Sequence, residues 1–245
     1  MRLRFRILMT LLLLTLSNFV RAQEFGLSFS YFIPKNGYFS TPISPFSIRG
    51  LGVDLNRFLA LETGASLYRM SGLNMKDLPF ESREPLVGPN FTIFVPVELV
   101  IQFHGQQAEF DIKGGVFGFY GFDQKINYGN FDRAFKAYQG WEVANGNLTF
   151  ENSPGWGYHG GAELLVYVTP SMGISLEANY LVGGSKFPLR GTYTGGNATN
   201  ETITLGDEYQ QAMIDFTGLE VSIGLVFSQG GGGPAPKSKY KKKRR

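Results

Sequence analysis

Residues 90–122 read NFTIFVPVELVIQFHGQQAEFDIKGGVFGFYGF, and this stretch decides the fold. Apolar side chains fill every second position from Phe91 to Phe103, and the second arm alternates Phe110 and Ile112 with charged residues. A period of two predicts strands, and the short polar connection His-Gly-Gln-Gln predicts a hairpin. Each arm has one almost uncharged face about ten residues long, the length of a tilted membrane-spanning strand. A hairpin of a soluble β-sandwich is the alternative.

The rest of the chain repeats this pattern. We expect eight strands, at residues 24–33, 46–55, 59–70, 90–103, 108–122, 156–168, 173–183 and 212–227. Three connections are short (56–58, 104–107 and 169–171), and they alternate with four long ones (34–45, 71–89, 123–155 and 184–209). Short turns on one side and long loops on the other are typical of an outer-membrane barrel. The sequence therefore predicts an all-β fold, an eight-stranded antiparallel up-and-down transmembrane β-barrel, over residues 23–228.

Aromatic residues support two membrane interfaces. Four of them lie beside the short turns or the end of the last strand: Phe58, Phe103, Phe110 and Phe227. Seven lie near the opposite strand ends: Tyr31, Phe91, Tyr120, Phe122, Trp156, Tyr158 and Tyr180. Two such belts are expected where amphipathic rings lie at the two edges of a bilayer. Pro96 in the middle of a strand cannot donate a ladder hydrogen bond, so we expect a bulge or bend there.

Charge is segregated along the chain. Seven basic residues end it: Lys237, Lys239, Lys241, Lys242, Lys243, Arg244 and Arg245. Four more arginines lie within the first 21 residues, so the remaining 12 Lys+Arg face 20 Asp+Glu, a balance of −8. An acidic body does not favour nucleic-acid binding, which needs a basic face. The chain has no cysteine, so disulfides and thiolate metal sites are excluded, and we expect neither metal nor other cofactor.

Residues 1–22 have the order of a signal peptide. Three arginines precede the apolar run Ile7–Leu16, and small residues stand before Gln23. We expect cleavage there and a bacterial outer-membrane location with periplasmic termini and extracellular long loops; an uncleaved anchor is the alternative. No later segment has the roughly 20 apolar residues of a membrane-spanning helix.

Three features carry a resemblance. The segment Ala22-Gln23, the arm Phe-Val-Pro-Val-Glu-Leu at 94–99 and the eight-strand layout resemble the Bacteroidota-type small outer-membrane β-barrel family, which shares the architecture of OmpA/OmpX-like barrels. The resemblance implies the barrel fold. Members of that family include accessory components of the type IX secretion apparatus, and the family has no catalytic motif to transfer to this chain.

Several charged residues are expected to point into the barrel. If the apolar face meets lipid, the inward acidic residues are Asp54, Glu62, Glu98, Asp111, Glu163, Glu177 and Glu220, with Lys113 as their one clear basic partner. Most lie near short turns, so we expect them in the periplasmic half. They form either a hydrated polar plug or a vestibule that attracts cations. A barrel of eight strands is too narrow for a general solute channel.

The sequence predicts no enzyme. Only His104 and His159 are present, and a lone histidine is more often structural than catalytic. His104 lies in a short turn, and neither Ser153 nor Ser185 is placed by sequence as a partner of His159.

Two segments are candidates for binding. Residues 229–236 form a Gly/Pro linker before the basic tail 237–245, which is typical of an interaction segment. We expect the tail in the periplasm, where it meets lipid head groups, an acidic periplasmic or envelope protein, the acidic vestibule, or no fixed partner. In the 123–155 loop, Phe135, Tyr138 and Trp141 either stack on a surface ligand or form a self-packed loop core. The favoured function is a non-enzymatic outer-membrane anchor or scaffold, and the second is a surface-binding or adhesion module.

Overall fold

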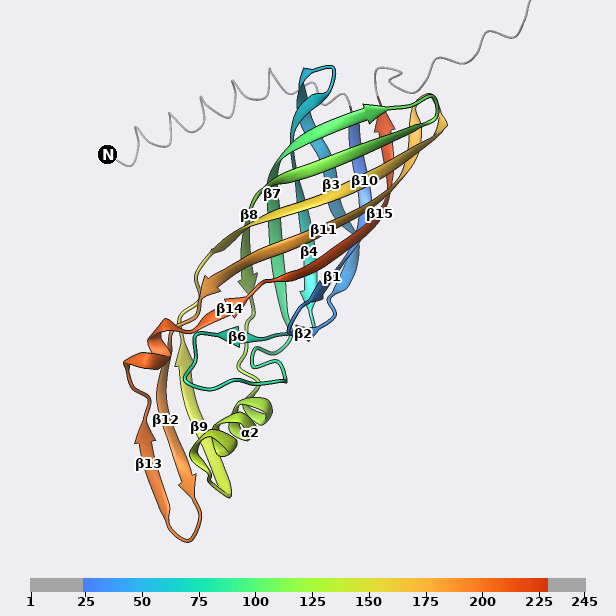
Figure 1. Cartoon of the computed structure of the whole chain (residues 1–245). Coiled ribbons are helices and arrows are strands. Elements are labelled where there is room, and N and C mark those ends of the chain that lie inside the picture. Colours follow the sequence, from blue (N-terminus) through green and yellow to red (C-terminus); the bar gives the residue numbers. More distant parts are fainter. Residues whose placement is uncertain (1–23, 229–245) are drawn as a thin grey trace, which may run out of the picture.

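The computed structural model describes residues 24–228, and eight of its strands close into an antiparallel barrel (Figure 1). The barrel strands are β1 (Glu24–Pro34), β3 (Thr41–Asn56), β4 (Leu59–Met70), β7 (Asn90–His104), β8 (Ala108–Phe122), β10 (Gly155–Thr169), β11 (Met172–Lys186) and β15 (Gly218–Ser228). Each pairs with its neighbour in sequence, and β1 pairs with β15 to complete the ring. The fold is therefore the predicted up-and-down transmembrane barrel. The predicted signal segment and basic tail lie outside the described residues.

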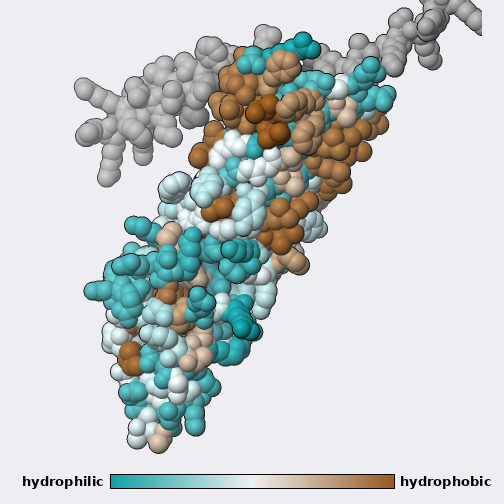
Figure 2. Space-filling model, viewed as in Figure 1, coloured by the Kyte–Doolittle hydropathy of each residue, from teal (hydrophilic) through white to brown (hydrophobic). Residues whose placement is uncertain are grey.

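The outer face of the barrel is apolar. Along the barrel strands every second side chain is aliphatic or aromatic and points outward. The barrel is therefore mostly brown in Figure 2, whereas the end formed by the long connections is mostly teal and white. Of the aromatic residues expected at the interfaces, those that are exposed on this outer face are Phe58, Phe103, Phe110, Tyr31, Tyr120, Phe122, Trp156, Tyr158 and Tyr180. So much exposed apolar surface is stable only in contact with lipid or detergent. Among the described residues, no helix is long and apolar enough to cross a membrane.

The long connections are not irregular loops. The segment 123–155 contains α2 (Tyr128–Gln139) and β9 (Val143–Phe150), and the segment after β11 contains β12 (Leu189–Gly196), β13 (Asn200–Thr204) and the 3₁₀ helix η1 (Asp207–Gln211). Strands β13, β12 and β9 form a separate three-stranded sheet. Together with residues 71–88, which include β5 (Gly72–Leu73) and β6 (Met75–Lys76), they project from one end of the barrel (Figure 1). We call residues 71–88, 123–154 and 187–217 the loop-side domain.

Two strand predictions are wrong at their ends. The second barrel strand begins at Thr41, and the two-residue strand β2 (Gly37–Tyr38) pairs with β5 before it. The expected strand 212–227 is two strands, β14 (Met213–Asp215) and β15, with Phe216 and Thr217 between them, although both strands pair with β11 in one register. The ring of Phe216 turns into the barrel, where it stacks on Phe32 at 4.5 Å and on Phe119 at 4.3 Å.

Strand β3 has several register irregularities, whereas the bulge expected at Pro96 is absent. On β4–β7 the pairs Thr63–Val97 and Ser66–Phe94 keep one register on both sides of Pro96, although the pairs between them are missing. The hydroxyl of Thr63 donates to the Pro96 carbonyl at 2.6 Å. In β3, by contrast, the register with β4 shifts between Ile48 and Leu51, and Gly50 has a φ of 69°, where glycine is favoured. The irregularity therefore reverses the inward phase of β3.

Two adjacent glycines of β8 allow a test of how closely the strands approach. A Cβ on Gly115, which faces inward, would lie 2.1 Å from the Val97 carbonyl oxygen, whereas one on Gly114, which faces outward, would lie 3.8 Å from its nearest atom. We expect Gly115→Ala to destabilise the barrel by about 1–3 kcal/mol or more through forced backbone movement. Gly114→Ala should stay within about 0.5 kcal/mol. Urea unfolding in detergent micelles measures both, and equal effects would contradict the close approach.

Candidate functional site: the filled barrel interior

A layer of ion pairs crosses the middle of the barrel. Lys113 on β8 lies with its Nζ 2.5 Å from Glu163, 3.7 Å from Glu62, 3.7 Å from Glu177 and 3.8 Å from Glu98. These carboxylates come from β4, β7, β10 and β11, so one ammonium joins strands from most of the ring. The side chain of Lys113 is almost completely buried. Such a buried cation is retained only when carboxylates surround it.

Arg49 is a second buried cation that the sequence reasoning missed. Its guanidinium pairs with Glu220 and lies 3.9 Å from Glu177. Glu220 also accepts a hydrogen bond from the hydroxyl of Tyr68. Lys113 is therefore not the one inward basic partner. The signal was hidden because the β3 bulge reverses the strand phase: Ser47 and Arg49 point inward before it, and Gly52 after it.

The predicted acidic residues do not form one cluster. Glu62, Glu98, Glu163, Glu177 and Glu220 belong to the ion-pair layer, and Asn179 bridges two of them, donating to Glu177 at 2.7 Å and to Glu220 at 3.2 Å. Glu220 pairs with Phe32 near the loop-side end of β1, so it lies away from the short turns, contrary to the expectation. Asp54 and Asp111 are instead found toward the short turns. Five carboxylates against two cations leave the layer with excess formal negative charge.

Aromatic rings close the barrel above this layer. Phe32, Tyr68, Phe94, Phe117, Phe119 and Phe216 are all buried and form the aromatic layer. Phe216 is at its centre, with ring centroids 6.0 Å from Phe117 and 6.3 Å from Phe94. Side chains from four different barrel strands, together with Phe216 between β14 and β15, therefore fill the loop-side mouth. The core continues from here into the loop-side domain.

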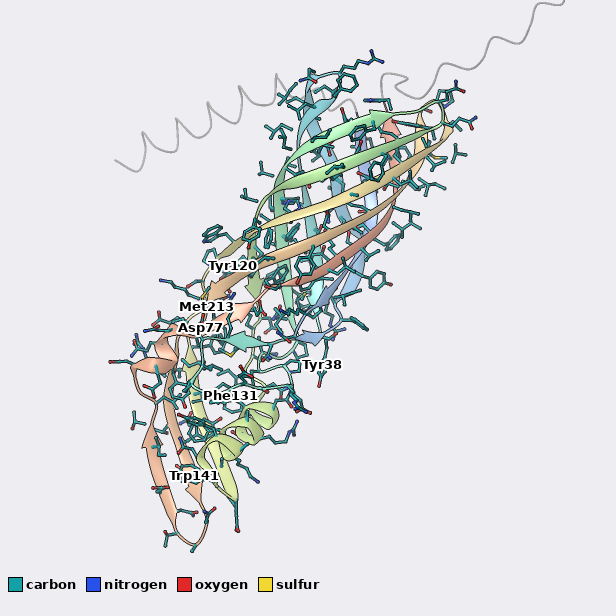
Figure 3. All side chains as sticks on the ribbon, viewed as in Figure 1. Tyr38, Asp77, Tyr120, Phe131, Trp141 and Met213 are labelled. Carbon is teal, nitrogen blue, oxygen red and sulfur yellow. The ribbon has the colours of Figure 1, made fainter. Side chains whose placement is uncertain are left out.

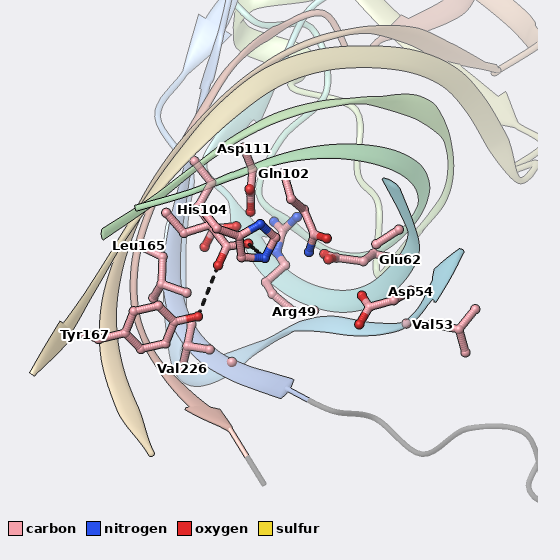
Figure 4. Close-up of a pocket in the computed structure, with 16 residues that line it drawn as sticks. Arg49, Val53, Asp54, Glu62, Gln102, His104, Asp111, Leu165, Tyr167 and Val226 are labelled. Carbon is pink, nitrogen blue, oxygen red and sulfur yellow. Dashed lines mark hydrogen bonds and ion pairs between the residues drawn. The ribbon is translucent and has the colours of Figure 1, made fainter. Parts of the chain in front are cut away.

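A cavity opens below the ion-pair layer. It has a volume of about 130 Å³, and its lining includes Asp54, His104, Glu109, Asp111 and Val226 (Figure 4). We call this cavity the vestibule. Since Asp54, His104 and Glu109 adjoin the short turns, it opens toward the end of the barrel where β1 begins and β15 ends. Glu109 accepts a hydrogen bond from Tyr167 at 3.2 Å and lies 3.5 Å from His104.

Neither histidine is placed for nucleophilic catalysis among the described residues. His104 pairs with Glu109 at the short-turn end. His159 is buried with its Nε2 3.7 Å from Glu98, and its ring nitrogens have no hydrogen-bond partner. Ser185 is buried with its hydroxyl unpaired. Within residues 24–228, no three histidine or carboxylate side chains are grouped as metal ligands.

The aromatic residues of the 123–155 loop are mostly buried. Phe135 has no exposed surface and stacks on Tyr193 at 3.8 Å, and Trp141 is 9% exposed and packs against Phe135. Figure 3 shows Trp141 in the loop-side domain. Only Tyr138 among the three predicted residues is exposed, at 49%. Stacking of Phe135 and Trp141 on a surface ligand is therefore wrong, because both rings form the core between α2 and the small sheet.

Tyr193 gives the loop-side domain a pH dependence. Burial raises the pKa of Tyr193, and so does the hydrogen bond that its hydroxyl donates to Asp132 at 2.9 Å. Because the folded state holds this proton more tightly, the stabilisation is complete below the ordinary pKa of about 10 and is lost as the pH rises above it. We expect the stability of the loop-side domain to fall there by up to about 1.4 kcal/mol per pH unit for this group.

Tyr193→Phe should reduce this alkaline slope, measured by urea unfolding followed through Trp141. Some slope should remain, since burial also raises the pKa of Tyr209. Tyr138→Phe, at an exposed phenol, is the control for loss of a hydroxyl. An unchanged slope in Tyr193→Phe would contradict the assignment.

Comparisons with known proteins found only distant likeness. No family model and no curated protein matches the chain. The solved structures to which it is similar include OprG from Pseudomonas aeruginosa, with 13% identity over 84% of this chain and 95% of OprG and a TM-score of 0.45. They also include a major outer membrane protein from Thermus thermophilus, with 10% identity over 83% of this chain and 98% of that one and a TM-score of 0.43. A third is Ail, the attachment invasion locus protein of Yersinia pestis, with 10% identity over 83% of this chain and 94% of Ail and a TM-score of 0.34. Nothing about activity follows from such distant likeness.

Proposed function

We propose that the protein is a non-enzymatic outer-membrane barrel that anchors a folded domain on one side and a partner-binding tail on the other. The observation that carries this proposal is the filled interior. The aromatic layer and the ion-pair layer cross the lumen one after the other with buried side chains, and this arrangement argues against passage of a solute. What the barrel presents to its surroundings is then the loop-side domain and the segment that follows β15.

The orientation belongs to the same proposal. Short turns face the periplasm in barrels of this class, so the loop-side domain would be extracellular and both chain ends periplasmic. Proteolysis of intact cells tests this orientation. Cleavage within the loop-side domain with the basic tail protected supports it, and cleavage of the tail on intact cells overturns it.

The proposal also includes a partner protein in the cell envelope. The basic tail, Lys237 to Arg245, would bind an acidic surface of a periplasmic or envelope protein, and the family resemblance suggests an accessory of a secretion apparatus. Full-length protein and a variant ending at Ser228 should be purified from detergent-solubilised outer membranes. A partner that co-purifies only with the full-length chain supports the scaffold, and an identical set of co-purifying proteins contradicts it.

Planar bilayer recordings test the closed lumen separately. We expect no steady conductance from the purified protein. A stable ion-conducting pore in the full-length chain would replace the anchor with a channel.

The surface-binding function is second. The burial of Phe135 and Trp141 argues against stacking on these two rings, so a ligand would bind the exterior of the loop-side domain, where Tyr138 is exposed. Deleting residues 130–150 should abolish such binding and leave a tail-dependent partner in place.

A further inference from the structure

The inner wall of the vestibule has a buried carboxyl oxygen without a hydrogen-bond partner. Asp111 is 6% exposed, it lines the cavity, and its Oδ1 has no hydrogen-bond partner. The two buried cations of the ion-pair layer already have carboxylate partners: Lys113 is shared among four glutamates, and Arg49, which also lines the cavity, pairs with Glu220 and lies 3.9 Å from Glu177. A buried carboxylate oxygen without a partner is costly, so an occupied vestibule would contain a donor for it.

The rim of the vestibule is acidic as well. Asp54 is exposed beside the β3–β4 turn, and Glu109 lies across the mouth with His104 and Tyr167 (Figure 4). The path from rim to Asp111 is therefore lined by carboxylates. Since no metal-ligand grouping occurs among the described residues, the fitting ligand is an organic cation that donates hydrogen bonds.

The size of the vestibule fits the end of a lysine or arginine side chain. A volume of about 130 Å³ admits one ammonium or guanidinium group with its last carbons, and it is too small for a folded partner. The apolar wall formed by Leu165 and Val226 suits the methylene stem of such a side chain.

The chain supplies such side chains next to the mouth. Val226 lines the vestibule, and the linker 229–236 begins three residues later. A Gly-rich linker of this length spans about 15 Å on average, from roughly 5–6 Å times the square root of its residue number. Seven of the nine residues that follow it are basic.

We propose that the vestibule is a binding site for a lysine- or arginine-rich segment and that its resident occupant is the chain's own tail, Lys237 to Arg245. A basic side chain of the tail enters the mouth and donates to Asp111, and the other basic residues pair with the acidic rim. This inference goes beyond the proposed scaffold, because an external partner of the tail must first displace the tail from the vestibule. The protein then has two states, one with the tail in the vestibule and one with the tail bound to the partner.

Disulfide trapping in the purified full-length protein tests the contact. The chain has no cysteine, so pairs can be introduced without background. Gln102→Cys places a thiol on the vestibule wall without removing a charge, and Ser238→Cys places one among the basic residues of the tail. We expect this pair to form a disulfide several-fold faster than the matched pair Phe103→Cys with Ser238→Cys, since Phe103 points outward on the same strand.

Charge distinguishes binding from tethering. A short flexible linker alone gives a high effective concentration, so some trapping occurs in any case. Replacing the seven basic residues with glutamine keeps the linker and both thiols, and it should reduce trapping to the level of the outward pair. Raising the salt from 0.1 M to 1 M shortens the Debye length from about 10 Å to about 3 Å and should act in the same direction.

Asp111→Asn should also slow trapping, whereas Asp123→Asn, at an exposed carboxylate on the loop side, should not. Reaction of each single cysteine with a small maleimide corrects for differences in thiol access. Equal corrected rates for the two pairs, or trapping that ignores charge and salt, would overturn the proposal. Because no partner is present, this result is independent of whether the scaffold captures one.

Discussion

Lys113→Met should destabilise the barrel by about 3–5 kcal/mol, the cost of removing one member of a buried ion pair. The substitution keeps an unbranched side chain that is one atom shorter, and it deletes the charge that four glutamates share. Those carboxylates stay buried next to one another, on four different strands, with only Arg49 left in their layer. The destabilisation is therefore a repulsion across the ring, and it should appear as a lower urea midpoint followed through Trp156.

The matched control is Lys125→Met. Lys125 lies 3.5 Å from Asp123, but both side chains are mostly exposed, so the loss should stay within about 1 kcal/mol. Trp156 is 70% exposed on the outer barrel face and reports barrel unfolding once Trp141 is replaced by Phe. Similar losses for the two lysine variants would mean that water reaches the ion-pair layer and screens it.

A double variant separates charge from packing. Adding Glu163→Gln to Lys113→Met removes the carboxylate nearest to the ammonium, and it should restore part of the lost stability. If the stability losses of Lys113→Met and Glu163→Gln simply added in the double variant, the result would contradict a cation shared among the glutamates.

The sequence predicted the barrel because a strand that faces lipid repeats every two residues. Leu59–Met70 and the hairpin from Asn90 to Phe122 have nearly the predicted bounds, since no bulge interrupts their alternation. The prediction fails where the backbone leaves that period. A two-against-one bulge at Arg49 and Gly50 reverses the phase of β3. Phe216 keeps the inward phase of β15, but the alternation alone does not show that its ring packs on Phe32 inside the barrel.

The loop-side domain was missed for a different reason. Its helix had local signals: the Asn127 side chain accepts from the Asn130 N–H, Phe131 and Phe135 are four residues apart, and Gly140 ends the helix with a φ of 69°. These signals cover only three turns, and the partners of the two rings come from β12, about 60 residues away. Residue pattern cannot show that two separate loops share one core.

Phe135→Ala should therefore unfold the loop-side domain selectively. The ring has no exposed surface and contacts Tyr193 and Trp141, so its removal leaves a cavity that costs about 3–5 kcal/mol. With Trp156 replaced by Phe, the remaining Trp141 reports this domain, and its urea midpoint should fall well below that of the parent. Cleavage by a protease should also become faster within residues 123–154.

Tyr138→Ala is the matched control, because Tyr138 is on the same helix and is half exposed. It should change the Trp141 midpoint by much less, since its ring contacts Phe80 at the domain surface. The two variants also decide between the two readings of the loop aromatics. If Phe135→Ala left the domain folded but abolished binding of a surface ligand, the ring would serve recognition. If the ring is part of a buried core, Phe135→Ala should unfold the domain, and any loss of ligand binding should follow from that unfolding.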